Sequence, residues 1–331
     1  TAQGVYFSRA AQVYAIADPS RSVQELQSQF AALFSGLFMG IEVFARMGGA
    51  TAVLIGGIDG KSLYTFFFVL SVVAVTVTAT LFDVDAMLVE LKKVQDTKLT
   101  PSDAKPKPPI SPLSTLKLLL TDPRVLLLLP NNLAKGAAES FMSDFANGDL
   151  IKTAMGIPAI GYISGIASVV AALVGLSTAL INKTCGRQTT MQFGHVAWLT
   201  LGLTPLISVA SAGGVEALEV LPGAAWFAAG LYLSYALGRG VWESTNRYVS
   251  AALFPEHLDE IFALIRFGEG IAATSLFLIC GAISCDDGSP IDVVILVVAV
   301  LAIPCYATAE WISSKSLPSR ESNAKEGLIG H

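Results

Sequence analysis

Long uncharged apolar runs alternate with short polar segments along most of the chain. The hydrocarbon core of a bilayer is crossed by about 20 predominantly apolar residues in a helix, so each of these runs predicts a membrane-spanning helix. The uncharged runs are Ser62–Phe82, Ala154–Ile181, Thr189–Gly214, Val220–Gly238 and the shorter Val293–Ala309.

Three further segments are apolar but carry charged residues. They are Gln29–Ile55, Arg124–Asn147 and Ile261–Ser284, which brings the predicted spans to eight. In the second of them, Pro130 precedes two asparagines and is expected to interrupt the backbone hydrogen bonds. Lipid cannot replace those bonds, so this stretch should face other helices or water.

Composition supports membrane insertion. Of the 331 residues, 53% are hydrophobic and only 14% are charged, whereas soluble domains carry roughly 25% charged residues. The net charge of -5 does not favour a nucleic-acid partner. The pattern therefore predicts an all-α polytopic membrane protein that is embedded in the lipid bilayer.

A passage rich in lysine and proline, KLTPSDAKPKPPISPLS at Lys98–Ser114, divides the chain. Its prolines favour an extended, solvated linker, with two spans before it and six after it. Two six-helix bundles joined by a long cytoplasmic connection are the plan of the major facilitator superfamily. The expected division is an incomplete N-terminal bundle (1–85), a cytoplasmic linker (86–122), a six-helix bundle (123–314) and a cytoplasmic tail (315–331).

Basic residues are concentrated in alternate loops. Only Lys61 and Lys152 fall in the loops on the other side. Cytoplasmic loops carry the excess of lysine and arginine, so both ends of this chain are expected in the cytoplasm. The sequence leaves the plasma membrane and an endosomal membrane both open.

Motifs of soluble enzymes fail on inspection. The segment GGIDGKS at Gly56–Ser62 has one residue too few between its glycines for a phosphate-binding loop, and Gly268-x-Gly270-x-x-Ala273 is not preceded by a strand. The four cysteines show no metal-ligand spacing, and no H-E-x-x-H motif is present. We expect no enzyme activity, no cofactor and no metal site.

Charged residues inside the predicted spans are the best candidates for chemistry. They recur three or four positions apart, which places each set on one helix face. Charge is costly in a bilayer, so such groups point inward and pair. They either form a substrate or proton path, for which Lys135 and Glu269 are preferred, or neutralise one another within each helix, with Arg247 at the cytoplasmic interface. The candidate network comprises Glu42, Arg46, Asn131, Lys135, Glu139, Arg239, Glu243, Arg266 and Glu269.

Two pairs of glycines have the spacing that allows helix backbones to approach closely in lipid. They are Gly36 with Gly40, and Gly161 with Gly165. Packing within the chain is the expected use, although a dimer interface would use the same residues.

Several passages together resemble the uncoordinated-93-like branch of the major facilitator superfamily, also described as ion-channel regulatory proteins. TAQGVYFSRAA at Thr1–Ala11 looks like the end of that family's fourth helix, and Ala154–Arg187 is similar to its eighth helix and G-R loop. Leu237–Phe254 resembles a tenth helix with Trp242 and Asn246 in register. FALIRFGE at Phe262–Glu269 resembles an eleventh-helix motif.

The resemblance implies a bundle that lacks its first three helices and most of a fourth. It departs from the family pattern at Arg239, where an acidic residue is usual, and at Glu243, where glutamine is usual. Family members are described chiefly as partners of potassium channels or as escorts that move receptors between membranes. The resemblance therefore implies an accessory protein that binds another membrane protein. The alternative is a secondary transporter of a small solute or ion.

Overall fold

A computed structural model describes residues 2–18, 20–58, 60–79, 112–214, 217–218, 223–283 and 289–316. Every element named in these ranges is a helix. The helices, with two π-helical segments, are α1 (Ala2–Ala17), α2 (Val23–Leu54), α3 (Gly60–Ala79), α5 (Pro112–Thr121), α6 (Pro123–Phe141), η1 (Met142–Ile151), α7 (Lys152–Met155), α8 (Ile157–Cys185), α9 (Arg187–Ala212), α11 (Ala224–Val241), η2 (Trp242–Asn246), α12 (Arg247–Leu253), α13 (Leu258–Ile283) and α14 (Ser289–Ser316).

The predicted spans correspond to helices wherever the structure describes them. Within the described ranges, five helices are long and apolar enough to cross a membrane, namely α2, α8, α9, α13 and α14. The other three spans correspond to α3, to α6 with η1, and to α11. Helix α6 continues through Pro130, from Pro123 to Phe141, although proline supplies no N–H to the backbone hydrogen bonds. The asparagines that follow Pro130 are buried against other helices, as expected.

Local sequence fixes several helix ends. The Ser22 hydroxyl caps α2 by accepting a hydrogen bond from the backbone N–H of Glu25 at 3.1 Å. Asp122 caps α6, with Pro123 in the first turn, where its missing N–H costs nothing. Partial burial opposes ionisation of Asp122, but hydrogen bonds from Arg124 outweigh it and hold the Asp122 pKa below its usual range. Between α8 and α9, Gly186 has φ of 82°, a conformation that favours glycine.

The end of the expected linker is helical. Residues 112–121 form α5, which leads directly into α6 through Asp122. Proline stands at the start of this helix, where its fixed φ is compatible with helical geometry. The remainder of the expected linker, at 86–111, lies outside the described residues.

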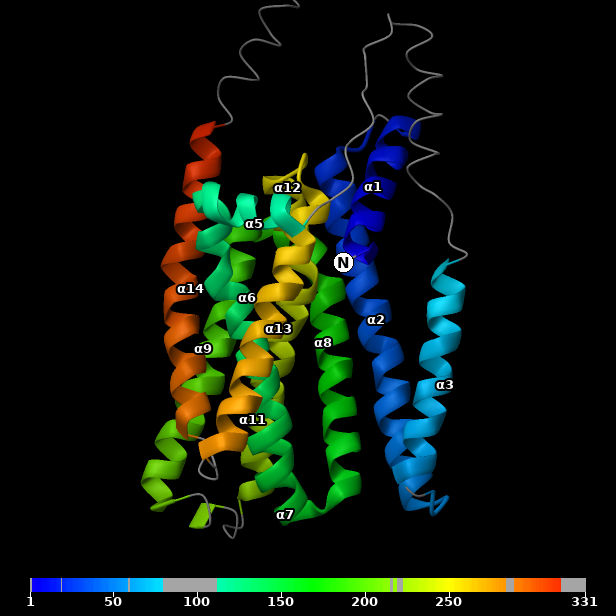
Figure 1. The fold of residues 1–331 in the computed structure, drawn as a ribbon, viewed down its shortest axis with the longest axis vertical. Coiled ribbons are helices and arrows are strands. Elements are labelled where there is room, and N and C mark those ends of the chain that lie inside the picture. The colour runs from blue at the N-terminus through cyan, green and yellow to red at the C-terminus, as the bar shows by residue number, and fades with distance from the viewer. Residues whose placement is uncertain are drawn as a thin grey trace, which may run out of the picture.

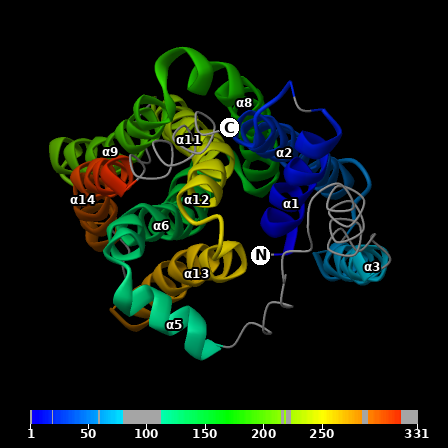
Figure 2. The same cartoon turned by 90° about the horizontal axis from the view of Figure 1, so that it is seen from above.

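The long helices run side by side and form an elongated bundle (Figure 1). Seen from above, α6 lies between α13, α14, α9 and α12, and α2 packs beside α8 (Figure 2). The start of α2, the end of α14, α5 and α12 lie at one end, whereas α7 lies at the other (Figure 1). The first end carries Arg21, Lys117, Arg124, Lys183, Arg187 and Lys315.

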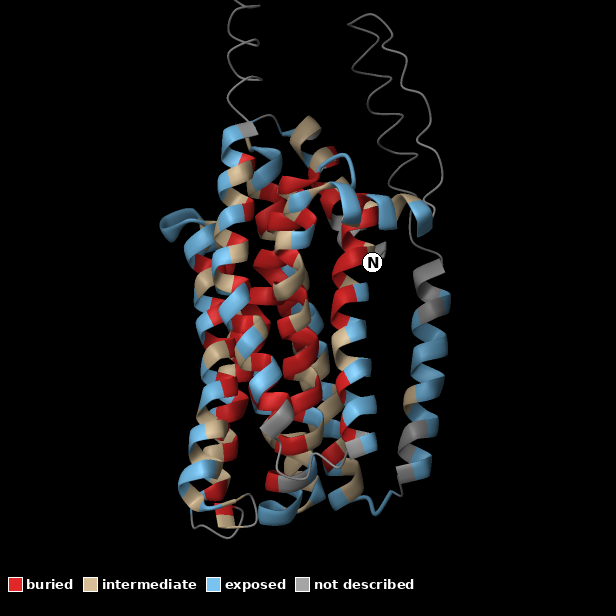
Figure 3. Ribbon diagram, turned by 60° about the vertical axis from the view of Figure 1, so that its left-hand side comes forward, coloured by how far each residue is buried: buried red, intermediate tan, exposed pale blue. Residues whose placement is uncertain are grey.

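Helix α3 lies at the edge of the bundle, beyond α2 (Figures 1 and 2). Its apolar side chains are exposed along most of its length, in contrast to the buried centre of the bundle (Figure 3). Phe68 is 68% exposed. Exposed apolar surface of this kind is suited to lipid or to another helix.

Helices α2 and α8 pack closely because glycine removes the side chains between them. A Cβ on Gly161 would lie 2.5 Å from the Ala50 Cβ and 2.9 Å from the Arg46 carbonyl oxygen, while Gly36 and Gly165 face side chains of the partner helix. Three of the four glycines singled out in the sequence thus serve packing within the chain. Gly40 has open space around it.

Replacing Gly161 by alanine should therefore destabilise the protein, whereas the same change at Gly40 should not. Forcing an extra methyl group into a packed contact typically costs 1–3 kcal/mol, and we expect about that for Gly161→Ala. Gly40→Ala fills open space and favours the helix. Thermal unfolding of the purified variants in one detergent measures both effects, and equal melting temperatures for the two would contradict this account of the α2–α8 contact.

Candidate functional site

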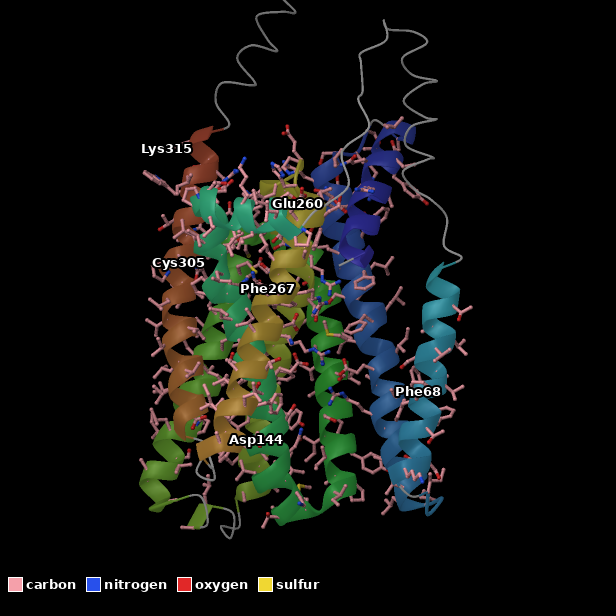
Figure 4. The ribbon with its side chains drawn as sticks, viewed as in Figure 1. Phe68, Asp144, Glu260, Phe267, Cys305 and Lys315 are labelled. Atoms are coloured by element: carbon pink, nitrogen blue, oxygen red, sulfur yellow. The ribbon has the colours of Figure 1, made fainter. Side chains whose placement is uncertain are left out.

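Lys135 is the centre of a charge network in the middle of the bundle. Its Nζ donates to Glu139 Oε2 at 2.8 Å on its own helix and to Glu269 Oε1 at 3.0 Å on α13. The Lys135 side chain is only 2% exposed. Figure 4 labels Phe267 in the middle third of the bundle, between Glu260 near one end and Asp144 toward the other. Glu269 is two residues from Phe267, so the network lies far from both ends.

The network continues from α13 to η2. Arg266 donates to Glu269 Oε2 at 2.6 Å and its Nη2 lies 3.7 Å from Glu243 Oε2, which also receives a hydrogen bond from Arg247. The ring of Trp242 packs between two of the cations, with centroid distances of 5.6 Å to Lys135 Nζ and 5.7 Å to Arg266 Cζ. An aromatic face attracts cations, so Trp242 adds to their stabilisation.

A second set of charges joins α2 to α11. Arg239 donates through both terminal nitrogens to the Glu42 carboxylate, at 3.0 and 2.6 Å, and Arg46 Nε donates to the same carboxylate at 2.6 Å. A two-pronged arginine–carboxylate pair fixes relative orientation as well as distance. Since Glu42 precedes residues 86–122 and Arg239 follows them, the pair joins segments from the two sides of the expected linker. Arg239 also interacts electrostatically with Glu139 and Glu243.

The structure places eight of the nine predicted site residues in these two sets of ion pairs and Asn131 in the neutral set described below, and it corrects one detail. Four local pairs form as their spacing predicts: Glu42 with Arg46, Lys135 with Glu139, Glu243 with Arg247, and Arg266 with Glu269. Arg239, however, takes Glu42 of another helix as its hydrogen-bonded partner. Arg247 is buried, at 4% exposure, and is paired with Glu243.

Beside the charges lies a chain of buried neutral groups. Asn131 is fully buried. Its Nδ2 donates a hydrogen bond to Asn246 Oδ1 at 2.9 Å, and its Oδ1 is hydrogen-bonded with His195 Nε2 at 3.0 Å. Asn246 in turn donates to Asn132 Oδ1 at 3.0 Å. The second imidazole nitrogen, Nδ1, lies 3.1 Å from Gln192 Oε1. The chain links α6, α9 and η2 through side-chain hydrogen bonds.

Sequence reasoning missed His195 as a site residue. The search for an H-E-x-x-H motif passes over it, yet His195 is 0% exposed and its ring lies 5.8 Å from that of Tyr306. The Tyr306 hydroxyl donates to Glu310, which also binds Arg187 at 2.7 Å. The sequence feature that could have identified His195 is its position, since an ionisable residue within an apolar span is a functional candidate by default.

Two departures from α-helical geometry position these groups. The π-helical segment η2 contains Glu243 and Asn246, and η1 directly follows the turn of α6 that carries Glu139. Such insertions rotate the following residues relative to a regular helix and are frequent at functional sites. In η2 the result is that all five residues, from Trp242 to Asn246, are buried.

The described residues offer no cluster of three or more metal-ligating side chains of the His, Cys, Asp and Glu types. Cys280, near the end of α13 opposite to α5 and α12, takes part in a disulfide. Disulfides form in oxidising compartments outside the cytoplasm.

The fold and this site define a class: the chain is an all-α polytopic membrane protein with a paired charge network in its core. No protein-family model matches the chain. It is similar to mouse (Mus musculus) protein unc-93 homolog A, with 26% identity over 242 residues that cover 71% of this chain and 50% of the relative. The chain thus spans about half the length of the curated relative it matches. This similarity supports an unc-93-like relationship.

Removing the positive charge of Lys135 should be far more harmful than removing an exposed one. Lys135→Met leaves two carboxylates without their shared cation, and breaking a buried ion pair from one side typically costs about 3–5 kcal/mol. Adding Glu269→Gln should restore part of the loss. Lys315→Met, the same substitution at an exposed position, should change stability by less than about 0.5 kcal/mol.

Unfolding in a graded series of denaturing detergent measures these variants side by side. If Lys135→Met unfolds at the same detergent fraction as Lys315→Met, the network does not stabilise the bundle.

Proposed function

We propose that the chain acts as an accessory or regulatory protein of another membrane protein, such as an ion channel or a receptor in transit. One observation carries the proposal: each charged side chain of the network contacts an opposite charge supplied by the same bundle. Charges that are paired with one another inside the bundle stabilise a scaffold. They are not arranged to receive a charged solute in this conformation.

The proposed architecture is of the major-facilitator type. In this reading, 123–314 is a six-helix unit, 1–85 belongs to an incomplete N-terminal bundle, 86–122 is a cytoplasmic linker and 315–331 a cytoplasmic tail. The close α2–α8 contact and the Glu42–Arg239 pair support a two-part arrangement, because both join segments from either side of the linker. The basic residues at the end that carries α5 support a cytoplasmic location for both chain ends.

A secondary transporter is the second candidate. Its support is the position of the ion pairs near the middle of the bundle, between segments that precede and follow the linker. Secondary transporters bind substrate at such an interface and rock one half against the other. Opening would require Glu42 and Arg239 to separate, which would release their charges for a solute or a proton.

Uptake into vesicles separates the two functions. The whole protein, reconstituted into liposomes, is offered labelled amines, organic anions and Rb⁺ as a K⁺ surrogate, beside a Glu269→Gln variant. The accessory function predicts uptake equal to that of protein-free liposomes for both proteins. The exposed Glu256→Gln variant controls for the substitution itself. Uptake that Glu269→Gln abolishes and Glu256→Gln keeps would overturn the accessory proposal and establish transport.

A partner measurement completes the test. Proximity labelling from the C-terminal tail in cells should mark a reproducible set of multi-pass membrane proteins with the wild-type chain and with Glu269→Gln alike, because the network lies inside the bundle. A labelled set that matches that of an unrelated multi-pass protein at equal expression would contradict an accessory role.

A further inference from the structure

A pocket lies between the start of α2, the end of α8 and α12, at the end of the bundle that carries the basic residues (Figure 1). Its volume of about 500 Å³ is within the range of roughly 300–1,000 Å³ that is typical of small-molecule sites. The wall is mixed. Ala179, Leu180 and the aliphatic stems of longer side chains supply apolar surface, and the polar groups include those of Ser22, Glu25, Gln29, Asn182, Lys183 and Tyr248.

The pocket lies where the apolar part of each helix ends. The predicted membrane spans begin at Gln29 on α2 and end at Ile181 on α8. The lining residues of the two helices, Ser22–Gln29 and Ala179–Lys183, extend to these limits and just beyond them. Since the apolar run of a helix matches the hydrocarbon core of the bilayer, the pocket is at the level of the lipid headgroups. Tyrosine, here Tyr248, is enriched at that level.

Two opposite charges line the pocket from different helices without pairing. Glu25 is in the first turn of α2 and Lys183 is in the last turn of α8. Neither forms an ion pair with another side chain in the described ranges. The Glu25 carboxylate receives one long hydrogen bond, from Gln29 at 3.4 Å. A ligand that carries both a negative and a positive group would satisfy both walls.

The amide of Asn182, beside Lys183, is incompletely paired. Its Nδ2 lies 3.5 Å from both Ser28 Oγ and Thr245 Oγ1, and its Oδ1 has no hydrogen-bond partner within the part of the chain that the structure describes. A donor group bound in the pocket would pair with Oδ1 once the amide turns toward it. The free acceptor favours a ligand whose positive group carries N–H bonds.

Exposed apolar surface leads from the pocket along the bundle. Leucines stand three or four positions from one another and from Gln29 or Lys183, so on each helix they share a face with that pocket residue. These exposed leucines are Leu33 and Leu37 on α2, and Leu173, Leu176 and Leu180 on α8. The two stripes meet where Gly36 faces the side chain of Leu176. We call this surface the leucine seam.

We propose that the pocket binds the headgroup of a phospholipid with a primary amine, as in phosphatidylethanolamine, and that its acyl chains lie along the leucine seam. The phosphate pairs with Lys183, and the ammonium group donates to Glu25 and Asn182. A trimethylated amine has no N–H to donate, and a glycerol headgroup has no positive charge. Both therefore match this wall less well.

The bound lipid would hold together segments from the two sides of the expected linker, because α2 precedes residues 86–122 and α8 follows them. This inference goes beyond the accessory function and applies equally to a transporter. A lipid that binds only the folded chain must raise its thermal stability in a saturable manner.

Native mass spectrometry of the purified chain in a mild detergent tests the proposal. Phosphatidylethanolamine, phosphatidylcholine and phosphatidylglycerol of one acyl composition are added in steps. One ethanolamine lipid should bind with a dissociation constant about tenfold lower than that of the other two, because a charge-assisted hydrogen bond is worth about that factor. Glycerophosphoethanolamine, which has the same headgroup without acyl chains, should bind far more weakly. Equal binding would show that the site takes a free phosphorylated amine and would overturn the lipid proposal.

Two charge variants assign the two ends of the headgroup. Lys183→Gln should weaken the binding of all three lipids, since each has a phosphate. Glu25→Gln should remove the preference for the ethanolamine lipid and leave the affinity for the choline lipid unchanged. Lys315→Gln, at an exposed lysine of α14, should behave like wild type.

A second pair of variants keeps every charge in place. Ala179→Phe fills the pocket, and Ser177→Phe adds the same side chain at an exposed position of the same helix. The saturable gain in melting temperature with the ethanolamine lipid should vanish in the first and persist in the second. If Ala179→Phe fails to fold, the loss of headgroup preference in Glu25→Gln is the deciding result. Equal affinity of wild type for the three lipids, or a preference that survives in both Glu25→Gln and Lys183→Gln, would overturn the proposal.

Discussion

The cost of charge in a low-dielectric interior is the constraint on which this structure depends. A lone ionised group at the centre of a bilayer costs about 2.5–3.5 kcal/mol on insertion scales, and helices α2, α6, α11 and α13 each carry at least one. Helix α11 carries Arg239 but no carboxylate of its own. Arg239 has its bound carboxylate on α2, and Lys135 on α6 shares a carboxylate with α13. Pairing of these charges therefore holds α11 against α2 and α6 against α13.

Close packing makes that convergence possible. Helices in lipid gain little from hydrophobic burial against one another, so they rely on van der Waals contact between small residues and on polar links. Gly136 brings α6 against the backbone carbonyl of Glu269 on α13, and Gly161 brings α8 against α2 at the turn that carries Arg46. The glycines that allow close approach thus lie beside the charges that need it. The pairing distances of 2.6–3.0 Å between helices follow from this shared location.

Sequence analysis succeeded where the relevant information is local. Apolar runs identified the eight helical spans, and spacing of four residues identified the Glu42–Arg46 and Lys135–Glu139 pairs. It failed where the outcome depends on neighbours distant in the chain. Arg239 has a carboxylate four residues away but pairs with one that lies 197 positions away, a choice made by helix packing. In the sequence His195 resembles a solitary core residue, whereas in the structure α6 places Asn131 within hydrogen-bond distance of it. Pro130, expected to interrupt the backbone hydrogen bonds, lies within the continuous helix α6, and the two asparagines that follow it are buried.

The link between Glu42 and Arg239 is the most direct test of this account, because this ion pair joins α2 to α11, 197 positions further along the chain. Exchanging the two residues would place a carboxylate on α11 between two arginines of α2. Glu42→Arg and Arg239→Glu, each alone, should lower the melting temperature in detergent, and the double substitution should recover most of the loss, as coupled neighbours do. A double variant whose loss equals the sum of the two single losses would contradict the account, since the two side chains would then act independently.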